Sequence, residues 1–180
     1  MTGLKLGISG AGFIARFQAV AMRQVRGIEF AGVTQHRRSH EVVKLAKDLG
    51  LGEPRIYKSV GEMAKNVDCL AIYSPNFSRI SVMEEIVAAV KGGAKLKGVI
   101  CEKPLGRSVA EARRLVELAQ SANLRTAYFE NQIFMKPLRA QLLGQDPAST
   151  LNTFRQEMQS FRNQVQHRRK FILAELNRGK

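Results

Sequence analysis

Apolar residues recur along this chain with two spacings, which alternate from Leu4 to about residue 130. Short apolar runs predict buried strands, and longer segments with an apolar residue at every third or fourth position predict amphipathic helices. A first strand begins at Leu4, and the next five are expected at residues 28–34, 55–57, 69–73, 99–102 and 125–130. Six strands separated by helices predict an α/β fold, a doubly wound parallel sheet with right-handed crossovers.

Polar residues and glycines mark where the intervening helices begin and end. Segments 59–62 and 108–111 both have serine followed three residues later by glutamate, which is the capping-box pattern of a helix start. Ser39 is expected to cap a helix that runs to residue 49, with Gly50 as its C-terminal stop. Further helices are expected to run from residue 13 to about 25 and from about 78 to 90.

The alternation breaks at residues 144–150, where turn-forming residues gather. This predicts a boundary between a first domain, 1–144, and a C-terminal helical extension, 145–180, with Pro147 at the first position of one long amphipathic helix. At about 100° per residue its apolar side chains fall within an arc of roughly 80°. They are Leu151, Phe154, Met158, Phe161, Val165, Ile172 and Leu176. This seam is expected to pack on the chain's own first domain, and a homodimeric helix contact is the alternative.

Composition is that of a water-soluble globular protein, with 44% apolar and 24% charged residues. There is no apolar run near the roughly 18 residues that a membrane span requires, and no secretory signal, so a cytoplasmic location is expected. Cys69 and Cys101 fall in predicted strands and are expected to be buried free thiols. No metal site is expected from the spacing of two cysteines and three histidines.

The formal net charge of +14 is unusual. It is compatible with nucleic acid, an acidic partner or a phosphorylated ligand. The excess is spread over both predicted parts of the chain, tryptophan is absent, and no aromatic RNA-binding cluster or zinc-finger spacing occurs. Nucleic acid is therefore the least favoured partner.

A glycine pattern at the end of the first strand carries the first chemical signal. Gly10, Gly12 and Ala15 are spaced as G-x-G-x-x-A between a predicted strand and helix. In a dinucleotide-binding turn, the first glycine permits the tight turn, the second admits the pyrophosphate, and the small third residue lets the helix pack closely. Phe13 and Ile14 then open a helix whose N-terminal N–H groups suit an anion. An ordinary glycine turn is the alternative interpretation.

The loop after the second strand indicates which nicotinamide cofactor, NAD or NADP, the chain binds. Enzymes that bind NAD place a carboxylate here for the ribose 2′-hydroxyl. This chain instead has Gln35, His36, Arg37 and Arg38, with no acidic residue. Two arginines suit a 2′-phosphate, so NADP is the expected cofactor and NAD the alternative. A solvated basic loop is the simpler interpretation, and His36 and His40 are expected to be surface residues of it.

Three segments together carry a family resemblance: GISGAGFIA at 7–15, YSPN at 73–76 and CEKPLGRSVAEARRLVELA at 101–119. They resemble the N-terminal domain of the Gfo/Idh/MocA oxidoreductases, the family of glucose-fructose oxidoreductase and inositol dehydrogenase, over residues 1 to about 140. The resemblance implies a Rossmann domain and hydride transfer between NAD(P) and a sugar, cyclitol or related hydroxy or carbonyl compound.

The resemblance also implies roles for residues beyond the strand ends, where open α/β sheets bind ligands. Ser74, Pro75 and Asn76 follow one strand, and Glu102 and Lys103 end another. By the family pattern, Lys103 is the catalytic residue that holds the substrate oxygen, and Glu102 helps to bind the nicotinamide ribose. A solvated strand-end ion pair is the alternative for these two.

This chain departs from the family pattern in two places. Where many members carry a histidine-containing segment, it has Phe77-Ser78-Arg79, and the resemblance stops after about Gln141, before the second domain that supplies the substrate pocket. The expected function is a truncated or minimal NAD(P)-dependent oxidoreductase of this type, with an unspecified small-molecule substrate, whose binding of NADP persists even if turnover is weak or lost. A non-catalytic NADP(H) sensor or interaction module is the alternative.

Overall fold

The computed structural model describes residues 3–130, Gln156 and Gln159. The chain divides into two units, 1–129 and 130–180, and the fold below is that of the first. The predicted boundary after residue 144, the apolar seam and the homodimer contact lie outside the described residues. Gln156 and Gln159 are both helical and exposed.

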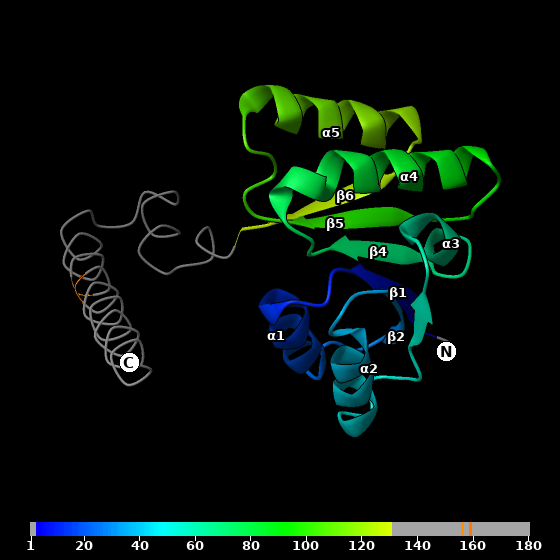
Figure 1. The fold of residues 1–180 in the computed structure, drawn as a ribbon, viewed down its shortest axis with the longest axis vertical. Helices are drawn as coiled ribbons and strands as arrows, with labels where there is room; N and C mark the ends of the chain where they lie inside the picture. The colour runs from blue at the N-terminus through cyan, green and yellow to red at the C-terminus, as the bar shows by residue number, and fades with distance from the viewer. Residues whose placement is uncertain (1–2, 131–155, 157–158, 160–180) are drawn as a thin grey trace. The chain divides into compact units, whose positions relative to one another are not determined.

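Strands and helices alternate through the first unit (Figure 1). The strands are β1 (Leu4–Ser9), β2 (Ile28–Thr34), β3 (Arg55–Tyr57), β4 (Cys69–Ile72), β5 (Gly98–Glu102) and β6 (Arg125–Phe129). The helices are α1 (Phe13–Met22), α2 (Ser39–Asp48), α3 (Val60–Ala64), α4 (Arg79–Lys91) and α5 (Val109–Ser121), with a 3-10 turn at Asn76–Ser78 before α4.

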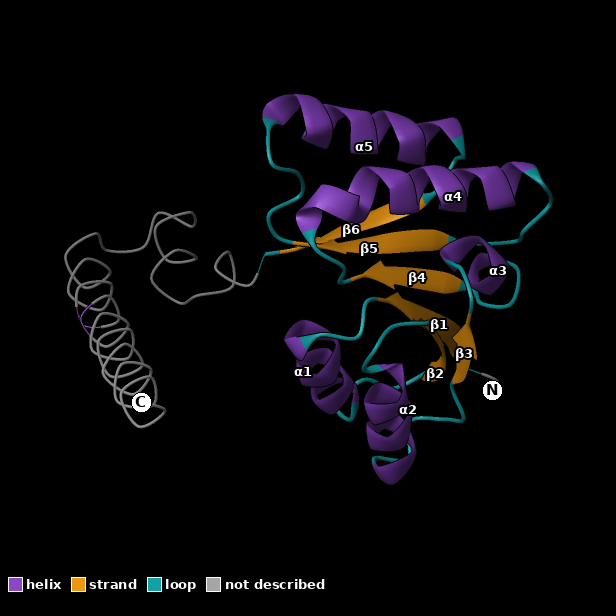
Figure 2. Ribbon diagram, viewed as in Figure 1, coloured by secondary structure: helices purple, strands orange, loops and turns teal. Residues whose placement is uncertain are grey.

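All six strands pair in parallel in the order β3-β2-β1-β4-β5-β6, which confirms the predicted doubly wound sheet. The order reverses between β1 and β4, and such a switch point opens a crevice at the carboxyl ends of the strands. Figure 2 shows α1 and α2 on one face of the sheet and α3, α4 and α5 on the other. Each face has its own apolar core, around Phe30 and Val42 on the first and around Met63 and Ile86 on the second.

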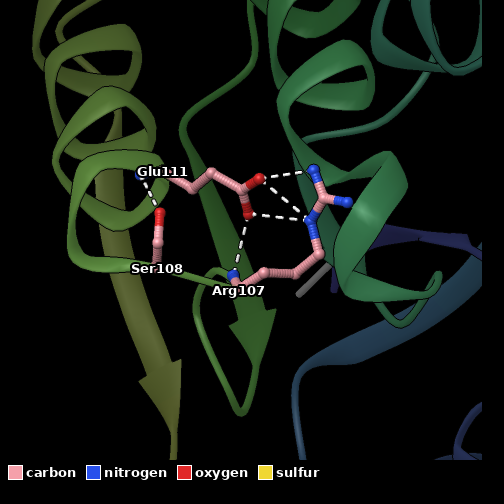
Figure 3. Close-up of polar contacts among 3 residues, drawn as sticks. All are labelled: Arg107, Ser108 and Glu111. Carbon is pink, nitrogen blue, oxygen red and sulfur yellow. Dashed lines mark hydrogen bonds and ion pairs between the residues drawn. The ribbon is translucent and has the colours of Figure 1, made fainter.

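Both predicted serines cap their helices, but each glutamate accepts the N–H of the residue before the serine, Lys58 or Arg107, instead of the N–H of the serine itself. The hydroxyl of Ser59 accepts the Glu62 N–H at 3.1 Å, and the hydroxyl of Ser108 accepts the Glu111 N–H at 3.2 Å (Figure 3). The Glu111 carboxylate accepts the N–H of Arg107, at 2.8 Å, and binds its guanidinium. The hydrogen bonds from Arg107, the side-chain bond first, lower the pKa of Glu111.

Several predicted element boundaries differ from the observed ones by one to three residues, and three of these differences have a local cause. Ser39 is the first residue of α2 rather than its cap, because its buried hydroxyl donates to the Thr34 carbonyl at 2.7 Å and accepts the His36 N–H at 2.7 Å. Helix α1 ends at Met22 because the next N–H groups form shorter turns. Helix α4 begins at Arg79, after the 3-10 turn.

Among residues 3–130, no helix is long and apolar enough to cross a membrane. That part of the chain also contains no group of three or more histidine, cysteine or acidic side chains placed to hold a metal ion. Cys101 is buried and Cys69 half-buried, both are free, and burial raises the pKa of both thiols.

Candidate functional site

A cavity of about 670 Å³ lies at the carboxyl ends of β1, β2, β4 and β5, across the switch point of the sheet. It gathers predicted site residues from four separate loops. Those that line it are Gly10, Gly12, Phe13, Ile14, Arg37, Arg38, Ser74, Pro75, Asn76, Glu102 and Lys103. Ala15 and Gln35, which were also predicted, do not line it.

The two glycines of the turn after β1 are needed for different reasons. Gly10 has a φ of +109°, and a Cβ there would lie 2.8 Å from the Ser74 nitrogen, so the protein itself requires glycine. A Cβ on Gly12 would meet nothing within 4 Å. The space beside Gly12 is open to a ligand. Ala15 is fully buried in the core beneath α1, which fits the close packing expected of the third motif position.

The N-terminus of α1 faces this open space. Gly12 is its N-cap residue, no side chain among residues 3–130 caps it, and its first turn contains no acidic residue. Uncapped N–H groups at the positive end of a helix form a site for an anion.

The loop after β2 brings three cationic or titratable side chains to the cavity. His36, Arg37 and Arg38 line it and are exposed. Gln35 is exposed outside the lining, and its N–H donates to the Tyr57 carbonyl at 2.7 Å. His40 is exposed and lies outside the lining as well. His36 is an exposed residue of this loop, as predicted, and it also lines the cavity.

The loops after β4 and β5 form the other side of the cavity. Glu102 is only 9% exposed, and its carboxylate accepts the Lys103 N–H at 3.0 Å and the Gln18 side-chain amide of α1 at 3.5 Å. Lys103 is exposed at the rim. The buried hydroxyl of Ser74 has no hydrogen-bond partner among the described residues.

Arg79 is a residue of this site that the sequence analysis did not identify. It lines the cavity, is only 4% exposed, and donates to the carbonyls of Ser74, Glu102, Pro104 and Leu105. The sequence holds one signal for it: a cation in the first turn of a helix faces the positive end of the helix dipole and needs compensating acceptors.

Tyr73 is the second such residue, since it entered the sequence analysis only as part of a motif. Its side chain lines the cavity and contacts the ring of Phe129, with centroids 6.3 Å apart. Burial, and then the nearby charge of Glu102, raise the pKa of its phenol. Tyr73 therefore keeps its proton at neutral and mildly alkaline pH.

The profile of the Gfo/Idh/MocA group, described as an oxidoreductase family with an NAD-binding Rossmann fold, matches residues 4–129. This chain belongs to that family. Among curated relatives, glucose-6-phosphate 3-dehydrogenase of Bacillus subtilis is 30% identical over 123 residues, which are 68% of this chain and 32% of the relative. The rhizopine catabolism protein MocA of Rhizobium meliloti is 25% identical over 173 residues, 86% of this chain and 51% of the relative.

Solved structures agree with the family. An Agrobacterium radiobacter oxidoreductase in complex with NAD+, L-tartaric acid and magnesium has a TM-score of 0.62 at 26% identity, over 77% of this chain and 39% of that one. A Lactobacillus casei scyllo-inositol dehydrogenase with bound NAD(H) and scyllo-inositol has the same TM-score of 0.62 at 21% identity and shares the fold, over 79% of this chain and 41% of that one. The chain thus spans from about a third to a half of the length of these family members.

Proposed function

We propose that this chain binds a nicotinamide dinucleotide in the cavity at the switch point, NADP(H) in preference to NAD(H), and that it carries out hydride transfer on a sugar, cyclitol or related compound. The observation that carries the proposal is the open space beside Gly12, in front of an uncapped helix N-terminus. The family supplies the class of ligand.

The lining residues fit the successive parts of a dinucleotide. The turn from Gly10 to Ile14 would hold the pyrophosphate on backbone N–H groups. Arg37 and Arg38 would meet the 2′-phosphate, because no carboxylate follows β2 to accept a free 2′-hydroxyl. The loop of Ser74 and the Glu102 carboxylate lie on the side of β4 and β5, where they suit the nicotinamide ribose.

Lys103 is the catalytic residue of this proposal. Its exposed side chain follows Glu102 at the rim of the cavity, where a substrate has access. When bound, the nicotinamide ring supplies or accepts the hydride. In the reducing direction, the Lys103 ammonium would donate a hydrogen bond to the carbonyl oxygen of the substrate and stabilise the negative charge that develops there.

The substrate class rests on the relatives. These relatives include a sugar-phosphate dehydrogenase and an inositol dehydrogenase. Both names describe oxidation of a secondary alcohol on a polyhydroxylated ring.

The test has two stages. Titration of the chain into NADPH and NADH, followed by the fluorescence of the reduced nicotinamide, is expected to show saturable binding with higher affinity for NADPH. Absorbance at the reduced-nicotinamide band with a panel of sugars, sugar phosphates and inositols then measures turnover. Binding without turnover across the panel would favour a non-catalytic NADP(H) module, and no binding of either dinucleotide would contradict the proposal.

A further inference from the structure

The loops that follow β4 and β5 are not joined to each other by backbone pairing. The last residues of β4 and β5 that pair with each other are Ile72 and Cys101. Ser74 and the segment Glu102–Leu105 lie past that pair, so the sheet ladder does not hold them together. Their separation determines the width of the cavity on the side proposed for the nicotinamide.

The Arg79 guanidinium spans this gap. From the first turn of α4 it donates to the Ser74 carbonyl at 3.4 Å on one loop. On the other loop it donates to the carbonyls of Glu102, Pro104 and Leu105. Lys103 stands between two residues whose carbonyls Arg79 holds, so its backbone is fixed on both sides.

Neither burial nor the helix favours a cation at this position. Arg79 is only 4% exposed, and the N-terminus of α4 is the positive end of that helix. Burying a charge is costly unless hydrogen bonds compensate it. The guanidinium donates to four backbone carbonyls and also interacts with the Cys101 thiol, and none of the salt bridges among residues 3–129 includes it. These carbonyls belong to the two loops of the site. The hydrogen bonds that compensate the buried charge therefore also hold the two loops in place.

We propose that Arg79 is a positioning residue for the nicotinamide half of the ligand: it clamps the loop of Ser74 to the loop of Lys103 and sets the gap into which the nicotinamide riboside fits. This inference rests on the proposed function. In addition, the two halves of the ligand would be held by different parts of the protein: Arg79 and its loops would hold the nicotinamide riboside, and the turn of Gly12 and the loop of Arg37 would hold the rest. The hydrogen bonds of Arg79 include none to the turn of Gly12 or to the loop of Arg37.

The test compares whole and half ligands on the full chain. NADPH is paired with 2′-phospho-ADP, and NADH with ADP, because the second member of each pair lacks the nicotinamide riboside. Isothermal titration calorimetry gives the dissociation constants. In Arg79→Met, affinity for the whole ligand is expected to fall about tenfold, while affinity for the half ligand stays within about twofold. Arg113→Met, on an exposed position of α5, is the matched control and leaves both unchanged.

Arg79→Lys guards against a methionine variant that fails to fold. Lysine keeps the cation but has three donors at one point, so it cannot span both loops as the planar guanidinium does. In Arg79→Lys, affinity for the whole ligand is expected to fall about threefold, while affinity for the half ligand is unchanged. If Arg79→Met does not fold, the result for Arg79→Lys is the test. If the ratio of the dissociation constants of the whole and half ligands stays the same in these variants, the proposed role of Arg79 is wrong. Failure of the parent chain to bind either pair would instead contradict the proposed function.

Discussion

The two sides of the cavity are built by different means. On the side of β1 and β2, the site consists of backbone and exposed arginines: a glycine turn, an uncapped helix end, and Arg37 and Arg38. On the side of β4 and β5, side chains hold the loops: the buried Arg79 donates to their carbonyls, and the half-buried Gln18 of α1 donates to the carboxylate of Glu102.

The difference follows from what each side has to do. A pyrophosphate is an anion that a helix N-terminus attracts without any particular side chain. Hydride transfer needs a carbon and an oxygen held at fixed positions, and such precision comes from loops whose side chains are themselves held. Under the proposed function, the first side would therefore serve affinity, and the second would serve geometry.

The largest expected effect is on the first side. Gly12→Val should abolish dinucleotide binding, because the side chain would fill the space that the pyrophosphate needs. The domain should remain folded, since a Cβ there meets nothing within 4 Å. Gly10→Val is the contrasting control and should also lower the melting temperature, because its Cβ would lie 2.8 Å from the Ser74 nitrogen. Calorimetric titration and thermal melting measure both, and unchanged NADPH binding in Gly12→Val would place the phosphates elsewhere.

Lys103→Ala tests the second side. With a substrate that turns over, the rate of hydride transfer should fall by about a hundred- to a thousandfold, because the developing charge on the substrate oxygen loses its cation. Dinucleotide affinity should stay within about threefold, since the side chain is exposed at the rim. Steady-state rates and fluorescence titration provide the two numbers. Turnover that survives the substitution would remove Lys103 from the mechanism.

Arg37→Ala combined with Arg38→Ala should erase the preference for NADPH over NADH. Losing one charge-assisted hydrogen bond to the 2′-phosphate is worth about 1.5–3 kcal/mol, which is about ten- to a hundredfold in affinity. The affinity for NADH should not change. Equal affinities for the two dinucleotides in the parent chain would show that these arginines form only a solvated basic loop.

The smallest effect is expected at the opposite end of the sheet. The Asp68 carboxylate accepts from Lys97 at 2.8 Å and from the Lys5 N–H at 2.9 Å, and these bonds, that to Lys97 first, lower its pKa. A lowered pKa in the folded state stabilises the fold above the ordinary value of about 3.9, and this contribution is lost as pH falls through the folded pKa.

Asp68→Asn should therefore lower the free energy of unfolding by up to about 1 kcal/mol at neutral pH, and by less under acid conditions. Urea unfolding across pH checks this. Asp48→Asn, whose carboxylate binds only Lys44 among the contacts that the structure gives, is the control and should have a smaller effect. Dinucleotide affinity should be the same in both variants, and a change in Asp68→Asn would mean that the two ends of the sheet are coupled.

Local patterns were sufficient to predict most of the fold. Apolar runs located all six strands, and the serine–glutamate pairs located α3 and α5, because both signals depend on residues within one or two turns of each other. The role of Ser39 was wrong because its hydroxyl bonds to the preceding loop instead of its own helix, and no local pattern distinguishes those partners.

The sequence by itself determined the glycine turn and the absence of a carboxylate after β2, since backbone freedom and residue type are local properties. Tertiary structure decided the rest of the site. Arg79 and Glu102 are 23 positions apart, and Gln18 and Glu102 are 84 apart. Only the folded sheet brings these groups within hydrogen-bonding distance, because parallel strands bring the loops at their carboxyl ends to one edge.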